Sequence, residues 1–347
     1  CFNFTEKIDN FVSTDYSFNT IKKYLTLANE SIYLNMYEFT NPYLCDELID
    51  CLLRNVSVNI LIEGSPVGGV CDTEKYLLNR INTYGGNIRI KSSDIKNKVF
   101  SRYRFNHAKY LLIDNHTTII ESCNWAKTGV PIDPSFGNRE WGIIVKNNSV
   151  ADYYLNVFFD DWNTSFSEIS TFKEVDWFIP NNYYFDNYYH KGNYEQQFYS
   201  EIFYDDFSVK PVFSPDTSFN EIYNLINSAE KSIYIEQLYI YKYWDSELNP
   251  LLEVLSSKAK NGVDVRVIMN YNPFYKSTNQ EMNLTKNYLE KNNVKVKFIY
   301  TNWSIFTNLH NKGAIIDNES VLISSINWNK NSFMNNREAG IIIKNNN

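Results

Sequence analysis

The chain contains one sequence pattern twice, and this internal repeat limits its fold more than any other feature. Residues 17–39, SFNTIKKYLTLANESIYLNMYEF, match residues 218–240, SFNEIYNLINSAEKSIYIEQLYI. Each copy has apolar residues at helical spacing and then a β-rich run, which predicts a helix followed by a strand. The length of 347 residues also suits two domains. The sequence therefore predicts one kind of domain, present twice.

Helix and strand patterns continue to alternate within each copy, which is typical of a layered α/β domain. The expected helices span 45–55, 72–86, 247–262 and 279–293, and the expected strands span 56–64, 87–92, 263–271 and 294–300. Residues 149–162 predict one more helix after the first copy, without a counterpart in the second. We therefore expect the natural protein to continue beyond Asn347 with the missing helix.

These patterns predict three regions. Residues 1–165 form the first domain, residues 166–210 a bridging segment rich in tyrosine, and residues 211–347 the second domain. We expect the bridge to pack over both halves, although its aromatic rings could instead stack on bases or sugars in a cleft.

A second set of matched residues is polar, and scaffold duplication alone does not explain it. The first copy reads FNHAKYLLIDNHTTIIESCNW at 105–125 and NRE at 138–140, and the second reads NLHNKGAIIDNESVLISSINW at 308–328 and NRE at 336–338. His107 and Lys109 are two residues apart in a predicted strand, as are His310 and Lys312, so each pair shares a face. If the copies pair about a pseudo-two-fold axis, the two histidines, the two lysines, Asn124 and Asn327 converge.

Such a pocket suits a phosphodiester. Ammonium and amide groups would bind the phosphoryl oxygens and their developing charge. One imidazole could attack phosphorus, while the other protonates the leaving oxygen and then activates water. Glu140 and Glu338 are suited to orienting a histidine, as a carboxylate does in a catalytic triad. The motif lacks the acidic cluster of a two-metal site, so we expect no metal and no cofactor.

The two runs HAKYLLID…ESCN and HNKGAIID…SSIN resemble the phospholipase D superfamily, whose signature is HxKxxxxD followed by GSxN. The resemblance covers both copies and implies two pseudo-symmetric α/β/α sandwich domains packed about a shared active site. It also implies a phosphohistidine intermediate, with His107 as nucleophile and His310 as acid.

The resemblance further implies roles for the other matched residues. Lys109, Lys312, Asn124 and Asn327 would bind phosphate, and Ser122 and Ser325 either join them or pack at strand ends. Asp114 and Asp317 would be structural, or would support the site from behind. Glu121 and Ser324 depart from the pattern because they replace its glycines, and Glu121 could crowd or acidify one rim. His116 is expected in a turn and His190 at the surface.

The resemblance leaves the substrate open. Lys98, Arg102 and Arg104 alternate with aromatic residues before the first motif, which favours a nucleic-acid strand. The net charge of −7 argues against general nucleic-acid binding but allows a local basic groove. We therefore favour a metal-independent nuclease acting on single strands. The alternatives are a phospholipase D or transphosphatidylase acting on lipid head groups, although no apolar docking loop is evident, and a binding protein with a relic site.

The hydropathy, the first residue and the cysteines of the chain bear on its location and assembly. No apolar run is long enough to span a bilayer, while the start at Cys1 and many Asn-X-Ser/Thr sites favour an exported or membrane-tethered protein. The five cysteines suggest free thiols, or one disulfide within Cys45, Cys51 and Cys71. One chain holds both half-sites, so we expect a monomer to suffice, with no obligatory protein partner and a dimer left open.

Overall fold

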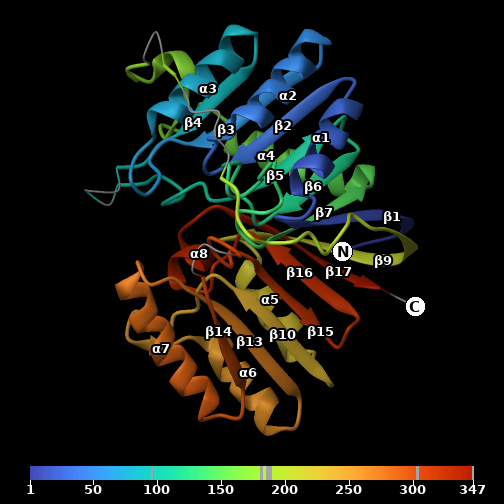
Figure 1. Ribbon diagram of the computed structural model, residues 1–347, viewed down its shortest axis with the longest axis vertical. Coiled ribbons are helices and arrows are strands. Elements are labelled where there is room, and N and C mark those ends of the chain that lie inside the picture. Colours follow the sequence, from blue (N-terminus) through green and yellow to red (C-terminus); the bar gives the residue numbers. More distant parts are fainter. Residues whose placement is uncertain (95–96, 98, 180–182, 185–189, 302–304, 346–347) are drawn as a thin grey trace.

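The computed structural model describes the chain except residues 95–96, 98, 180–182, 185–189, 302–304 and 346–347. Its two halves lie one above the other in Figure 1, the first from blue to green and the second from gold to red. Fifteen of the described strands form one continuous sheet, in the order β14-β13-β10-β15-β16-β17-β9-β1-β7-β6-β5-β2-β3-β4-β8. The halves join where β1 pairs antiparallel with β9.

The elements of the two halves follow the same order. The first half contains β1 (Phe2–Ser13), α1 (Ser17–Leu27), β2 (Ser31–Met36), α2 (Pro42–Leu53), β3 (Ser57–Glu63), α3 (Asp72–Thr83), β4 (Asn87–Lys91), β5 (Tyr110–Ile113), β6 (Thr117–Glu121), β7 (Glu140–Lys146), α4 (Asn148–Asp161), β8 (Ile169–Thr171) and the short 3-10 helix η1 (Phe172–Glu174). The second contains β9 (Ile202–Ser214), α5 (Ser218–Asn227), β10 (Ser232–Gln237), α6 (Pro250–Lys260), β13 (Asp264–Tyr271), α7 (Lys276–Glu290), β14 (Lys295–Tyr300), β15 (Lys312–Ile316), β16 (Ser320–Ser324), α8 (Lys330–Met334) and β17 (Glu338–Asn345), with a small separate hairpin of β11 (Tyr243–Trp244) and β12 (Glu247–Leu248).

Equivalent helices begin with the same local chemistry. Asn41 caps α2 by accepting hydrogen bonds from the backbone of the first turn, and Pro42 is the first helical residue. Asn249 and Pro250 begin α6 in the same way. An asparagine cap followed by proline favours helix initiation, because it satisfies free N–H groups and fixes φ. These caps place the two starts at 42 and 250, rather than at 45 and 247 as the apolar pattern predicts.

The mixed direction of the strands brings both motifs to one edge of the sheet. In the first half β2, β3 and β4 are parallel, while β5 runs antiparallel to β2. The start of β5 therefore lies beside the end of β2, and β15 lies likewise beside β10. We call this side, where β2, β3, β4, β10, β13 and β14 end, the motif edge. The histidine of each motif lies immediately before β5 or β15, at this edge.

The core has helices on both faces of the first half, as the predicted α/β/α layering requires. Helices α1, α2 and α3 contribute Ile21, Leu48 and Leu78 to one apolar cluster. On the opposite face, Tyr154 and Phe158 of α4 pack with strand residues from both halves. The Tyr154 hydroxyl donates to Gly340 O at 2.7 Å, so α4 also links the halves. The predicted helix at 149–162 is thus present as α4.

Strands β1 and β9 were not predicted, although they join the halves. Strand β9 begins at Ile202, inside the segment 166–210 that was expected to be a bridge. Cys45 and Cys51 are buried and Cys71 is exposed, and all are free thiols, so the alternative of a disulfide among them is wrong. Among the described residues, no helix has both the length and the apolar character needed to cross a bilayer.

Candidate active site

The two histidines are held crosswise, each by a glutamate from the other half. His107 Nδ1 lies 2.7 Å from Glu338 Oε2, and His310 Nδ1 lies 2.6 Å from Glu140 Oε1. Both glutamates are fully buried. A carboxylate at Nδ1 places the proton there and leaves Nε2 as the reactive nitrogen. The sequence predicted orienting glutamates but not that they cross between the halves.

The matched serines bind these glutamates rather than an open phosphate site. Ser122 Oγ donates to Glu140 Oε2 at 2.6 Å, and Ser325 Oγ donates to Glu338 Oε2 at 2.6 Å. Both serines are fully buried. Of the two roles considered, the structure therefore supports packing at the strand end, and the phosphate-binding assignment is corrected to a supporting contact.

Two buried lysines supply the positive charge of the site. Lys109 Nζ donates to His107 O at 2.7 Å, and Lys312 Nζ donates to His310 O at 2.5 Å. Burial lowers the pKa of Lys109 to about 8 and that of Lys312 to about 7, against the opposing effect of the buried glutamates. Both lysines therefore sit where a bound phosphate anion would strongly favour their charged forms.

Burial works against the charged form of both histidines. Burial lowers the pKa of His107 to about 4, although Glu338 acts to raise it. Burial also lowers the pKa of His310, against Glu140. Lys312 acts on His107 and Lys109 acts on His310, so the four groups from the two halves share one site. Burial acts to raise the pKa of Glu140, but His310, Lys312 and Ser122 hold it below its ordinary value.

The matched asparagines carry unused hydrogen-bonding capacity. Among the described residues, the buried Oδ1 atoms of Asn124 and Asn327 accept no hydrogen bond. Asn124 Nδ2 makes one long contact, 3.4 Å to Glu38 Oε2. Buried amides without partners are costly, which is consistent with a ligand that completes them.

Two arginines that the sequence did not single out hold the histidine backbones. Each occupies the middle of an NRE segment. His107 N donates to Arg337 O at 2.8 Å, and His310 N donates to Arg139 O at 2.9 Å. The guanidinium of Arg337 is bound by Asp161, at the end of α4. The recurrence of arginine in both segments was the available signal.

The contacts of the Arg139 guanidinium include a residue of the tyrosine-rich segment. Arg139 Nη1 lies 2.6 Å from Asp15 Oδ2, and its Nη2 donates to the Tyr194 hydroxyl at 2.8 Å. Tyr194 in turn donates to Asp15 Oδ1 and packs on Phe306 of the second half. This residue of the bridge therefore packs over both halves. Residues 180–182 and 185–189 of the same segment lie outside the described residues.

The two half-sites differ in their aromatic and acidic neighbours. The Tyr37 ring lies 4.7 Å from the His107 ring and 5.3 Å from Lys109 Nζ. Glu38, next in the chain, is half-buried, and burial raises its pKa despite Lys109. At the position that aligns with Glu38, the second copy has Tyr239. Sequence comparison of the halves could have revealed this difference, but neither residue belongs to the repeated motif.

The motif aspartates lie at the other end of their strands. Asp114 accepts backbone hydrogen bonds from Asn29, Glu30 and Ser31, ahead of β2. Asp317 accepts the equivalent three bonds ahead of β10. Both therefore fix the turn that precedes a strand. These contacts agree with the structural role considered for the two aspartates. They do not agree with a role in supporting the side chains of the site.

The replaced glycines do not change the rim of the site. Glu121 is fully buried, and its Oε1 accepts a hydrogen bond from Trp125 Nε1 at 2.8 Å. Burial raises its pKa to about 8. Ser324 Oγ donates to Lys312 O at 2.9 Å. The Glu121 side chain points into the core and so does not crowd the rim, but its charge acts to raise the pKa of Lys109.

One member of the basic run before the first motif, Arg102, is paired with acidic residues. Arg102 Nε lies 2.9 Å from Glu168 and its Nη1 lies 3.2 Å from Asp160. Arg104 lies over the ring of Phe105, and Lys98 is outside the described residues. The charge of Arg102 is therefore already used within the protein. This weakens the prediction that the basic run binds a nucleic-acid strand.

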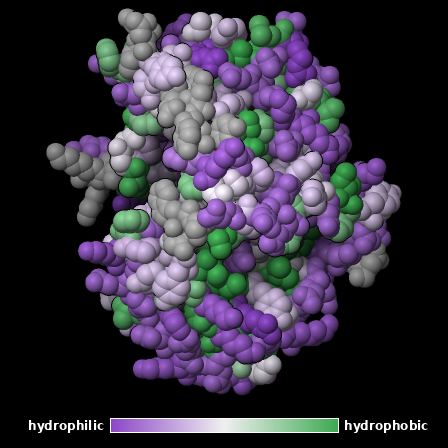
Figure 2. All heavy atoms as spheres, in the orientation of Figure 1, coloured by the Kyte–Doolittle hydropathy of each residue, from purple (hydrophilic) through white to green (hydrophobic). Residues whose placement is uncertain are grey.

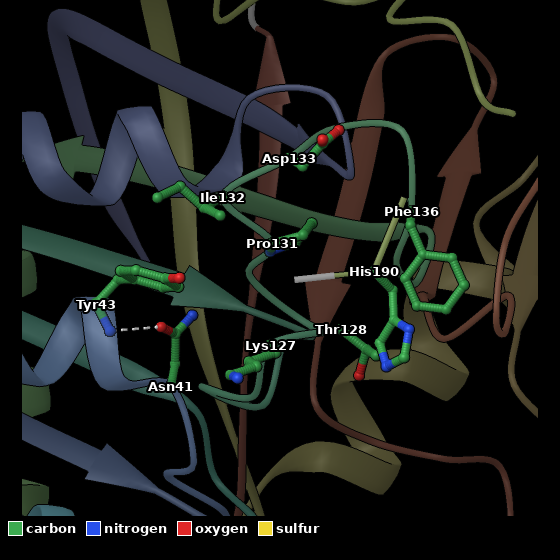
Figure 3. A pocket seen from close by; sticks show the side chains of 9 residues that line it. All are labelled: Asn41, Tyr43, Lys127, Thr128, Pro131, Ile132, Asp133, Phe136 and His190. Atoms are coloured by element: carbon green, nitrogen blue, oxygen red, sulfur yellow. Dashed lines mark hydrogen bonds between the residues drawn. The ribbon is translucent and has the colours of Figure 1, made fainter. Parts of the chain in front are cut away.

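The other two histidines lie outside the shared site. His116 Nδ1 is 2.6 Å from Asn148 Oδ1, in the turn between β5 and β6, as expected. His190 is exposed and lies beside Phe136 at a small hollow (Figure 3). That cavity measures about 20 Å³, and no motif residue lines it. A space of this size holds about one water molecule. Within the described part of the chain, no group of three or more His, Cys, Asp or Glu side chains is arranged to hold a metal ion.

Comparison with known proteins places the fold and the site in a family. The family described as "Cardiolipin synthase, PLD-like domain" matches residues 21–162 and 222–347. The chain thus belongs to the phospholipase D superfamily, through this PLD-like domain, and is an enzyme of the kind that acts on phosphodiesters. Both matched ranges carry one His-Lys motif each.

Curated relatives match almost the whole chain at low identity. A cardiolipin synthase of Clostridium perfringens is 23% identical over 344 residues, covering 97% of this chain and 67% of that protein. A cardiolipin synthase of Listeria welshimeri is 25% identical over 345 residues, covering 97% of this chain and 65% of that protein. The chain therefore spans about two thirds of the length of these relatives.

Solved structures support the fold. Phosphatidylserine synthase of Haemophilus influenzae has a TM-score of 0.69 at 14% identity, covering 97% of this chain and 82% of that one. Polyphosphate kinase of Porphyromonas gingivalis has a TM-score of 0.57 at 13% identity, covering 96% of this chain and 47% of that one. At these identities the likeness establishes the two-domain fold alone.

Proposed function

We propose that this chain is a phosphatidyl transferase or phospholipase D that acts on phospholipid head groups without a metal. The crossed pairs His107–Glu338 and His310–Glu140 carry the proposal for the chemistry, because they present two oriented imidazoles between two lysines. The choice of lipid over nucleic acid reverses the preference drawn from the sequence. It is supported by the curated relatives, which are named cardiolipin synthase.

The proposed reaction has two steps. His107 Nε2 forms a bond to phosphorus, and the bond from phosphorus to the head-group oxygen breaks as His310 donates a proton to that oxygen. The phosphatidyl group is then carried on His107. Next, His310 takes the proton of an acceptor alcohol or of water, whose oxygen attacks phosphorus and releases His107. The Nδ1–H groups bound to the glutamates hold both rings in the reactive tautomer.

The remaining polar groups of the site would stabilise charge. Lys109 and Lys312 would bind the non-bridging oxygens, whose negative charge grows in each transition state. The free amide capacity of Asn124 and Asn327 would complete the hydrogen bonding of the phosphate or of the acceptor hydroxyl. Both lysines are buried, so their attraction for the anion is stronger than it would be in water.

A paired assay in EDTA tests this function. Wild type and His107→Ala receive phosphatidylglycerol vesicles and, separately, an end-labelled single-stranded oligonucleotide. We expect wild type to release glycerol or form a new phosphodiester lipid, and to leave the oligonucleotide intact. His107→Ala should lose the lipid activity.

Two results would contradict the proposal. Cutting of the oligonucleotide with no change in the lipid would restore the nuclease hypothesis. Lipid turnover that persists in His107→Ala would show that this histidine is not the nucleophile. The ratio of glycerol release to new lipid separates hydrolysis from transfer.

A further inference from the structure

We propose that loops of both halves at the motif edge form a docking surface for a phospholipid bilayer, an inference that rests on the proposed lipid function. Val67 and Phe274 are 82% and 76% exposed. Tyr300, Ile305 and Val99 are also well exposed. Single exposed apolar side chains are common, so the argument depends on where these five lie.

Topology places all five at the same edge as the catalytic histidines. Val67 follows β3 and Phe274 follows β13, each between a strand end and the next helix. Val99 follows β4, while Tyr300 ends β14 and Ile305 follows it. The loops thus come in pairs related by the internal repeat. The sequence showed no apolar docking loop because these residues are isolated in the chain and gather only through the fold.

The underside of the Val67 loop is tied to the site. Val67 N donates to the Tyr37 hydroxyl at 2.8 Å, and the Tyr37 ring contacts His107. The exposed tip is therefore separated from the nucleophile by a single side chain. An apolar group that entered the acyl layer here would bring the adjacent head groups to the depth of His107.

The Phe274 loop is tied to the second half-site in a comparable way. Phe274 N donates to Asn272 Oδ1 at 3.0 Å, and Asn272 Nδ2 donates to Asn308 Oδ1 at 3.1 Å. Asn308 lies two residues before His310. The polar groups at the base of this loop are hydrogen-bonded within the protein. The Phe274 side chain at its tip is exposed. This arrangement fits a surface that inserts into a lipid interface.

Charge favours insertion over electrostatic attraction. The chain carries a net charge of −7, which repels anionic lipid. Arg102, from the basic run, is already paired with acidic residues. The space-filling view shows hydrophobic residues in separate groups on a mostly hydrophilic face (Figure 2). Binding through apolar tips should therefore persist in high salt, whereas binding through a basic patch would weaken.

Depth-dependent quenching tests the orientation directly. Val67→Trp and Leu53→Trp are made in a His107→Ala background, so that turnover has no influence. Leu53 is a matched control because it is 65% exposed at the end of α2, on the opposite edge of the sheet. Both variants are mixed with phosphatidylglycerol and phosphatidylcholine vesicles whose acyl chains carry bromine, at about 0.1 M and 1 M salt. We expect bromine to quench the fluorescence added at position 67 but not at 53, with little effect of salt.

A second variant measures affinity. Phe274→Ser should weaken vesicle binding by about tenfold, because the apolar ring no longer leaves water. Leu53→Ser should leave binding unchanged within about twofold, since a surface change away from the interface has little effect. Co-sedimentation with vesicles gives both values.

The outcomes separate this inference from the proposed function. Equal quenching at both positions, no quenching at either, or loss of binding in 1 M salt would overturn the docking surface, even if wild type cleaves phospholipid. Selective quenching at position 67 together with no lipid turnover by wild type would leave the docking surface standing and overturn the proposed function.

Discussion

At the scale of single residues, the reactivity of the site depends on carboxylates that reach across from the other half. His107 and His310 are ordinary imidazoles placed in a buried pocket that also holds two lysines, and both the burial and the lysines favour the neutral ring. Glu338 and Glu140 act in the opposite direction and fix the proton on Nδ1. The balance leaves His107 neutral, as a nucleophile must be.

The pH dependence of kcat/KM should report this balance. His107 must be deprotonated, so activity should fall below a pH of about 4, where its ring gains a proton. His310 must be protonated for the first step, and its pKa is lowered from 6.5, so activity should also fall on the alkaline side, with a midpoint below 6.5. We therefore expect a bell-shaped profile in the free enzyme. Initial rates on a short-chain monomeric phospholipid would measure it, and a flat profile would contradict the dyad.

The crossed pairing gives a second prediction. Glu338→Gln should lower kcat by roughly 1,000-fold, because an amide no longer holds the reactive tautomer of His107. It should also move the acid limb to lower pH, since Glu338 raises the pKa of His107. Rapid-quench measurement of phosphoenzyme formation tests the change. Glu140→Gln is the matched control: with a substrate whose leaving group needs no proton, such as a p-nitrophenyl ester, it should still form the phosphoenzyme, whereas Glu338→Gln should not. Identical defects in both variants would argue against separate roles.

At the scale of elements, close packing between the halves holds the two half-sites in register. Gly313 in β15 faces Trp141 in β7, and an added Cβ would lie 2.6 Å from the indole ring. Gly142, next to Trp141, allows an even closer approach of Phe11 from β1, whose ring would lie 2.0 Å from an added Cβ. Gly313 thus leaves room for an aromatic side chain of the other half, and Gly142 leaves room for one from the adjacent strand β1.

Filling one of these sites should loosen the contact between the halves. Gly313→Ala should lower the free energy of unfolding by about 1–3 kcal/mol, as overpacking does. Urea denaturation would measure the loss. In a Trp141→Ala background the same substitution should cost less, because the ring is gone and only the Leu322 carbonyl, 2.7 Å from the added Cβ, remains. An equal cost in both backgrounds would show that the strain arises elsewhere.

The sequence predicted the repeat, the alternation of elements and the convergence of His, Lys, Asn and Glu at one pocket. His107 and Lys109 do come together, but not on one strand face as the spacing predicted, because β5 begins only at Tyr110. The sequence could not assign Glu338 to His107, because that contact depends on how two distant strand ends face each other. It also did not indicate β1 and β9, which gain their stability from pairing with each other and with β7 and β17.

Other errors have equally local causes. Ser122 and Ser325 sit in the motif near the asparagines, but each comes directly after the end of its strand and its hydroxyl binds a glutamate. Asp114 and Asp317 lie five residues beyond their lysines, at the far end of a short strand, so they cannot reach the site. From the sequence alone, the basic run is free to bind a nucleic-acid strand. In the folded protein, Arg102 is paired with Asp160 and Glu168.

At the scale of the whole molecule, one chain brings two incomplete half-sites into a single site. His107 of the first half, the proposed nucleophile, is bound by the carboxylate of the second half, and His310 of the second half, the proposed acid, by the carboxylate of the first. Backbone hydrogen bonds also cross between the halves, because His107 N donates to Arg337 O and His310 N donates to Arg139 O. The continuous sheet, joined at β1 and β9, holds both crossings in one rigid frame.

The most direct test of this account is to trap the covalent intermediate. Wild type would be mixed in EDTA with phosphatidylglycerol labelled at phosphorus, quenched within milliseconds, and digested under alkaline conditions that preserve phosphohistidine. We predict an acid-labile label on the peptide containing His107, and none in His107→Ala. Label on the peptide containing His310, or turnover without any labelled enzyme, would contradict the account.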